Sequence, residues 1–97
     1  MVVIKMYIIL VYDISLIDNG QRVWRRVYKI CKKYLRHVQN SVFEGEVTKA
    51  QLFELRKSID KEIRDHLDSV VIFKTRSEKW LDRDIIGIQE DPTSNFL

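Results

Sequence analysis

The hydrophobic pattern is densest near the start of the chain, where seven apolar or aromatic residues run from Met6 to Tyr12. The run is short and ends at Asp13, which is typical of a strand buried on both faces at the middle of a sheet. Asp13 would then lie where a rigid strand gives way to a loop, a place suited to presenting a charge to a ligand. The alternative is that Asp13 is an ordinary turn residue or a helix cap.

Residues 21–35 follow a turn at Asp18-Asn19-Gly20 and repeat with the period of an α-helix. The apolar arc of this helix comprises Val23, Trp24, Val27, Tyr28, Ile30, Cys31, Tyr34 and Leu35. The opposite arc carries the basic residues Arg22, Arg25, Arg26, Lys29, Lys32, Lys33 and Arg36. Charges on a helix face often serve only solvation, but seven like charges with no acidic residue among them repel one another. The pattern therefore favours a surface that binds phosphate groups.

Residues 37–47 predict two short strands joined by a tight turn near Asn40-Ser41. Glu44 and Glu46 alternate with apolar residues in the second strand, so we expect both carboxylates on the solvent side of the sheet. Metal ligation by these two glutamates is the less common alternative. Gly45 between them indicates a bulge or a close approach of another part of the backbone.

A capping box predicts the start of the second helix, because Thr48 and Gln51 have the spacing at which each side chain bonds the other's backbone amide. We expect this helix to run to about Leu67. Its apolar stripe consists of Leu52, Leu55, Ile59, Ile63 and Leu67. The outer face mixes acidic and basic residues, which indicates an ordinary solvated helix, unlike the first one.

The remaining segments predict a strand over 70–73, a further short strand over 84–89 and a loose tail over 90–97. The order is strand, helix, strand, strand, helix, strand, with a small strand appended. This order predicts an α+β fold of the ferredoxin-like, split-βαβ kind, with 1–97 forming a single domain. A fold of this kind hosts many functions, so the function has to come from the site.

The overall charge of +3 hides a local concentration of positive charge. Residues 22–36 carry seven positive charges, which leaves a net −4 on the rest of the chain. The chain is 45% hydrophobic and 32% charged, as is usual for soluble globular proteins. Its single cysteine, Cys31, excludes an intrachain disulfide, and the apolar N-terminus lacks the features of a signal peptide. We therefore expect a cytoplasmic protein, and its small core makes a dimer a natural source of extra burial.

Several common chemistries are excluded by the sequence. It contains no glycine-rich phosphate loop and no cysteine and histidine cluster with zinc-binding spacing. Cys31 falls on the apolar arc of the basic helix, so we expect it to pack in the core rather than act as a nucleophile. Residues 41–46 lack the basic-Gly-aromatic signature of the RNA-recognition motif, which shares the predicted fold.

Five stretches, taken together in this order, point to a known family. They are Tyr7-Ile-Ile-Leu-Val-Tyr-Asp-Ile14, the basic helix from Arg22, Val38-Gln-Asn-Ser-Val-Phe-Glu-Gly-Glu46, the helix after Thr48, and Asp68-Ser-Val-Val-Ile-Phe73. The chain resembles the CRISPR-associated Cas-two family, spacer-acquisition proteins often described as endoribonucleases. The resemblance covers about Met6 to Phe73, and the block that begins at Val38 is its most specific part.

The resemblance implies a symmetric homodimer of ferredoxin-like subunits, in which the C-terminal strand near 85–88 adds to the partner's sheet. It implies a divalent cation, usually magnesium, between the two copies of the aspartate that ends the first strand, here Asp13. It also implies a CRISPR integrase subunit as a partner and duplex DNA across the basic surface. The chain departs from the family pattern in its extra residues 1–5 and in a less basic loop at 15–21.

Elementary chemistry agrees with a metal at Asp13, since magnesium prefers oxygen ligands and keeps several waters, so one or two carboxylates suffice. A two-fold axis near Asp13 would supply the second carboxylate. Such a metal activates water and stabilises charge on a phosphodiester, so we predict Asp13 as metal ligand and catalytic residue. Tyr12 and Ser15 are candidate helpers. The predicted nucleic-acid-binding residues are Arg22, Arg25, Arg26, Lys29 and Lys33, with the three arginines nearest the phosphates because they open the helix.

Three functional hypotheses remain at this point. The first is a metal-dependent endonuclease that cleaves RNA or DNA phosphodiesters. The second is a non-catalytic homodimeric adaptor that binds DNA and bridges the CRISPR integrase. The third is a toxin-type ribonuclease of related fold. The first two differ in whether they need Asp13.

Overall fold

The apolar run near the N-terminus forms an inner strand of a four-stranded sheet. The structure is a computed structural model that describes residues 3–87. Its elements are β1 (Lys5–Asp13), α1 (Gly20–Tyr34), β2 (Arg36–Gln39), β3 (Val42–Thr48), α2 (Lys49–Asp60), β4 (Ser69–Thr75) and a short 3-10 helix, η1 (Glu78–Trp80). The strand order is β2-β3-β1-β4, and every neighbouring pair is antiparallel. The predicted α+β, ferredoxin-like arrangement is confirmed.

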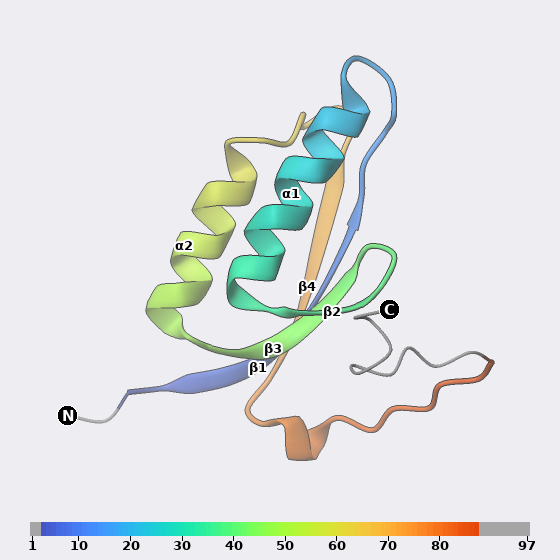
Figure 1. Ribbon diagram of the computed structural model, residues 1–97. Helices are drawn as coiled ribbons and strands as arrows, with labels where there is room; N and C mark the ends of the chain where they lie inside the picture. The colour runs from blue at the N-terminus through green and yellow to red at the C-terminus, as the bar shows by residue number, and fades with distance from the viewer. Residues whose placement is uncertain (1–2, 88–97) are drawn as a thin grey trace.

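Both helices pack on the same face of the sheet, as Figure 1 shows. On that face Ile8, Leu10 and Tyr12 of β1 are buried, and they form one core cluster with residues of both helices. Leu10 and Leu55 have no exposed surface. Truncation of either side chain to alanine is expected to cost about 2–5 kcal/mol of stability, because it removes buried contacts and leaves a cavity.

The second face of β1 is less covered than the sequence predicts. Ile9 and Val11 are only half-buried, and their partners on β4, Phe73 and Val71, are exposed. Residues 3–87 place no second layer of helices or strands over this side of the sheet. Within residues 3–87, the expectation of a strand buried on both faces is therefore wrong.

The turn before α1 has the predicted chemistry. Asp18 and Asn19 adopt left-handed backbone angles, with φ of 52° and 67°. Gly20 then lies against the Ser15 carbonyl oxygen, only 1.9 Å from where a Cβ atom would be. No larger residue fits at this position, so Gly20 allows the loop to close back on itself.

The second helix begins as predicted but ends early. The capping box between Thr48 and Gln51 is present in both directions. The helix ends at Asp60 rather than near Leu67. The reason is that the Arg64 N–H donates to the Asp68 carboxylate at 2.8 Å, a contact that replaces a helical bond to the preceding turn.

Of the two alternatives predicted for Gly45, the close approach is confirmed, because the backbone of Leu35 lies next to it, and the irregularity in the strand pairing lies in β2 between His37 and Gln39. One other local expectation is changed by the structure. The short strand expected at 84–89 is not formed over residues 84–87, and the rest of it, like the tail at 90–97, lies outside the described residues. Residues 84–87 pair with neither of the two outer strands, β2 and β4, so the backbone hydrogen bonds that define a strand are not made there.

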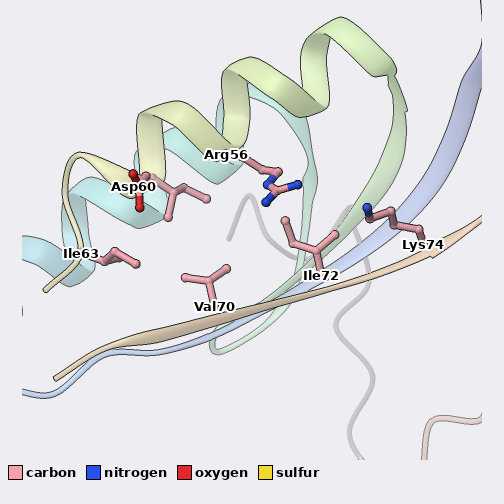
Figure 2. A pocket seen from close by; sticks show the side chains of 7 residues that line it. Arg56, Asp60, Ile63, Val70, Ile72 and Lys74 are labelled. Carbon is pink, nitrogen blue, oxygen red and sulfur yellow. The ribbon is translucent and has the colours of Figure 1, made fainter. Parts of the chain in front are cut away.

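A pocket of about 320 Å³ separates α2 from the edge strand β4. Its lining residues are Arg56, Ile59, Asp60, Ile63, Val70, Ile72 and Lys74. Figure 2 shows Arg56 reaching in from α2 and Lys74 from β4, above an apolar floor. The pocket is on the helical side of the sheet, so it is separate from the face that carries Asp13.

Candidate functional site

Asp13 is the last residue of β1, and it is exposed. Its register partner is Ser69, the first residue of β4. Because side chains alternate along a strand, Asp13 lies on the same side as Ile9 and Val11 and opposite the buried Tyr12. The structure thus places this carboxylate at the rim of the uncovered side of the sheet.

We call this uncovered side the open face, defined by Ile9, Val11, Val71 and Phe73 with Asp13 at its rim. Val71 is 47% exposed and Phe73 is 58% exposed. Both are opposite half-buried apolar residues of β1, so the four side chains form a continuous patch. A continuous exposed apolar patch usually marks an interaction surface.

The loop after Asp13 is fixed by an ion pair from the connection between α2 and β4. Asp68 accepts from the Arg64 Nε at 2.8 Å and, through its other oxygen, from the Ser15 backbone N–H at 3.0 Å. The Arg64 guanidinium also donates to the carbonyl oxygens of Ser15 and Ile17, at 2.7 and 2.5 Å. We call this pair the Arg64–Asp68 clamp.

The clamp is ionised over a wide pH range. Hydrogen bonds from the Arg64 guanidinium are the main cause that lowers the pKa of Asp68 from 3.8 to about 2, with help from the Ser15 N–H and against the effect of burial. The same hydrogen bonds raise the pKa of Arg64. The contact between the two side chains is therefore charge-assisted at neutral pH.

The helical side of the molecule carries the opposite kind of surface. Its basic stripe consists of Arg22, Arg25, Arg26, Lys29, Lys32 and Lys33, all of them exposed. The other side of α1 buries Val23, Val27 and Cys31 against the sheet. The predicted segregation of basic and apolar arcs is therefore confirmed.

Arg36, which follows α1, is the seventh basic residue of the predicted basic arc. Two of these seven residues have acidic partners that the local sequence does not reveal. Arg26 lies 3.1 Å from Glu62, which follows α2, and Arg36 lies 3.5 Å from Glu44 on β3. Across residues 3–87, no carboxylate lies within 4 Å of the other five basic side chains. The stripe thus keeps a largely uncompensated positive charge, which suits phosphate binding.

Asp13 and the basic stripe lie on different sides of the sheet. Figure 1 shows that α1 begins at the end of the sheet where β1 stops, so Arg22 and Asp13 share one end of the molecule. The stripe faces away from the sheet, however, whereas Asp13 is on the open face. One chain therefore does not gather its predicted binding and catalytic residues on one surface.

Glu44 has a role that the sequence did not predict. It is only 2% exposed, although it lies on the open side of β3, and it accepts hydrogen bonds from Tyr7 and Arg83. The expectation of a solvent-side residue is wrong for Glu44 and correct for the exposed Glu46. The alternation of residues along the strand cannot predict that Arg83 covers Glu44, because Arg83 lies 39 residues further along the chain.

Tyr12, Ser15 and Cys31 each have a structural role in the described chain. Tyr12 is buried between Trp24 and Phe43, and burial raises its pKa. Ser15 is bound through its backbone to the clamp. Cys31 has no exposed surface, and burial raises the pKa of its thiol to about 12, so core packing is confirmed.

A single copy does not contain a complete metal site in its described part. Residues 3–87 hold no group of three or more histidine, cysteine, aspartate or glutamate side chains close enough to bind one ion. Asp13 nevertheless offers an exposed oxygen ligand of the kind that magnesium prefers. The donor chemistry therefore fits this cation, and a second carboxylate beside Asp13 would strengthen the site.

Comparison with known proteins identifies the family. The model of the family "CRISPR associated protein Cas2" matches residues 6–83. The chain belongs to the Cas2 family. A curated Cas2 relative from Fusobacterium nucleatum, named CRISPR-associated endoribonuclease Cas2, is 53% identical to this chain. The alignment covers 96% of this chain and 88% of the relative's length. A second relative, from Moorella thermoacetica, is 43% identical, and the alignment covers 92% of this chain and 99% of the relative's length.

Solved Cas2 structures share the fold. One structure described only as that of Cas2 superposes with a TM-score of 0.78 at 38% identity and covers 91% of this chain and 93% of its own. The Streptococcus pyogenes Cas2 structure at pH 6.5 gives a TM-score of 0.68 at 29% identity and covers 76% of this chain and 89% of its own. Over the part of the chain described here, no helix is long and apolar enough to cross a membrane.

Proposed function

We propose that this Cas2 protein acts as a homodimeric, magnesium-dependent endoribonuclease in CRISPR spacer acquisition, with Asp13 of each subunit holding the cation. The observation that supports this proposal best is the exposed carboxylate at the rim of an uncovered apolar sheet face. The curated relatives named endoribonucleases favour RNA as the substrate.

The open face supports the proposed dimer. A second copy that packs its own open face on this one would bury Val71 and Phe73, which are about half exposed in one chain. A two-fold symmetric interface uses the same patch on both subunits, so it brings both Asp13 residues to the same interface. Such a dimer supplies the second carboxylate that the single chain lacks.

In this proposal, cation binding and phosphate binding fall to different residues of the chain. The two Asp13 carboxylates hold the cation, and the basic stripe attracts the phosphate backbone. When bound, a divalent cation lowers the pKa of a water molecule and stabilises the negative charge that develops on the phosphodiester. Each subunit contributes one carboxylate, so cleavage depends on the dimer.

The decisive variant is Asp13→Ala. We expect cleavage of single-stranded RNA to fall at least about 100-fold, because loss of a cation contact removes several kcal/mol of charge stabilisation. Binding of the same RNA should change little, since the basic stripe is untouched. Asp65→Ala removes an exposed carboxylate elsewhere and is the matched control. Cleavage by purified Asp13→Ala at the wild-type rate would rule out the metal mechanism.

A second candidate function is a non-catalytic adaptor that lays duplex DNA on its basic stripe and bridges a CRISPR integrase subunit. The observation that favours it is the separation of the stripe from Asp13 by the whole sheet. In this case Asp13→Ala would leave duplex binding and spacer integration intact, and Arg25→Glu would weaken both. An integration assay with the two variants separates the two functions.

A further inference from the structure

We propose that Arg64 and Asp68 are positioning residues that hold the Asp13 carboxylate where it can bind a divalent cation. This inference rests on the proposed function of Asp13. Arg64 and Asp68 act through the backbone on either side of Asp13.

The first link lies just after Asp13. Ser15 is pinned at both of its backbone groups, because its N–H donates to Asp68 at 3.0 Å and its carbonyl oxygen accepts from Arg64 at 2.7 Å. Only Ile14 separates this pinned unit from Asp13, and Ile14 is itself buried. The direction in which the chain leaves β1 is therefore fixed within two residues of the carboxylate.

The second link lies across the strand pair. Asp68 is followed directly by Ser69, which is the register partner of Asp13 on β4. The carboxylate that binds the chain after Asp13 is thus covalently attached to the residue opposite Asp13. The clamp ties together the end of β1 and the beginning of β4, so it holds Asp13 from both sides.

The third link is the rest of the loop. Arg64 also donates to the carbonyl oxygens of Ile17 and Asp18, which lead into α1. Among the residues that the structure describes, all side-chain hydrogen bonds from distant residues to the backbone of 15–18 come from Arg64 or Asp68. Leu16 and Ile17 are themselves 69% and 61% exposed, so without the clamp few contacts would hold this loop to the rest of the molecule.

The burial of the clamp distinguishes it from an ordinary surface ion pair. The Asp68 side chain has no exposed surface and that of Arg64 is 17% exposed, compared with 49% and 26% for Arg26 and Glu62. A buried pair is screened little by water or salt, and its geometry is fixed by several hydrogen bonds at once. It therefore suits the fixing of a nearby ligand; partners bonded directly to a metal ligand are typically worth 10–100-fold in metal affinity, and we expect the lower end here because the clamp acts through the backbone.

The test compares two isosteric changes made three residues apart. Asp68→Asn removes the charge and one acceptor oxygen of the clamp, whereas Asp65→Asn makes the same change at an exposed residue with no side-chain partner within residues 3–87. Mn²⁺ affinity is measured by titration calorimetry without RNA. We expect about tenfold weaker Mn²⁺ binding for Asp68→Asn and wild-type binding for Asp65→Asn. At saturating metal, kcat for RNA should fall and KM should stay unchanged, because the basic stripe is intact.

Several outcomes would overturn the inference. A lower melting temperature for Asp68→Asn together with wild-type Mn²⁺ affinity would make the clamp purely structural. If Asp68→Asn does not fold, Arg64→Lys provides the test, because a single ammonium group cannot reach all the carbonyl oxygens that the guanidinium binds, and wild-type Mn²⁺ affinity there would count against us. Wild-type Mn²⁺ binding by Asp13→Ala would instead refute the proposed function itself, so the two failures are distinguishable.

Discussion

The two sides of the sheet differ in almost every physical property. On the helical side, α1 and α2 cover most apolar residues apart from the pocket between α2 and β4, and α1 presents the basic stripe on its outer surface. The open face is apolar, is not covered by a second layer from residues 3–87 and carries Asp13 at its rim. The helical side thus buries most of its apolar residues within one chain, whereas the open face leaves Val71 and Phe73 about half exposed. The predictions below test this difference, from the largest expected effect to the smallest.

The open face is tested by Phe73→Asp. We expect the proposed dimer to dissociate at least about 100-fold more readily, because each subunit would lose an aromatic side chain from the interface and place a carboxylate among apolar residues. Cleavage should be lost with the dimer. Sedimentation velocity over a range of concentrations measures the dissociation constant.

Phe53→Asp is the matched control for this change. Phe53 is 64% exposed and Phe73 is 58% exposed, but Phe53 lies on α2, on the helical side. The control should remain a wild-type dimer. If Phe53→Asp dissociates the dimer and Phe73→Asp does not, the subunits associate through the helical side and the pairing of two Asp13 residues is lost.

The contribution of the Arg64–Asp68 clamp to stability is tested by lowering the pH. In the folded protein the pKa of Asp68 is about 2, below the ordinary 3.8, so its stabilising effect is fully present above pH 4 and is lost as pH falls toward 2. We expect Asp68→Asn to lower the free energy of unfolding by about 2 kcal/mol at pH 7. The difference from wild type should shrink steadily below pH 4, as measured by urea denaturation. A difference that stays constant from pH 7 to pH 2.5 would contradict this assignment.

The role of the basic stripe in nucleic-acid binding is tested by measuring how the affinity depends on salt concentration. Reversing the charge of two stripe residues, in Arg25→Glu with Lys29→Glu, should weaken nucleic-acid binding about tenfold at low salt. It should also make the plot of log K against log salt shallower by about two, because two phosphate contacts are lost. Fluorescence anisotropy at several salt concentrations measures both quantities. Lys57→Glu changes the charge of the neighbouring helix and should leave the slope as it is.

The smallest effect is expected for Glu62→Gln, which removes the partner of Arg26. This ion pair is partly exposed, so its loss should change the free energy of unfolding by less than about 1 kcal/mol. Freed Arg26 should bind phosphate slightly better, with a gain that disappears at high salt. A clear loss of nucleic-acid affinity would mean that Arg26 contacts phosphate only when Glu62 orients it.

Much of the fold could be predicted from local patterns. The inner strand, the basic helix, the capping box at Thr48 and the turn at Asn19 are encoded within a few residues each, and all four are present. The early end of α2 could not be predicted, because it depends on the bond between Arg64 and Asp68. The burial of Glu44 was missed for the same reason, since Arg83 covers it from a distant segment.

The sequence by itself determined the order of the elements, the family resemblance and the position of Asp13 at the end of its strand, because periodicity and turn chemistry act over neighbouring residues. Only the tertiary structure decided that the second face of the sheet is open, that Asp13 lies on it and that a clamp from the α2–β4 connection holds the adjoining loop. These features arise from contacts between segments far apart in the chain. The side chains that make such contacts carry no local pattern from which their partners can be predicted.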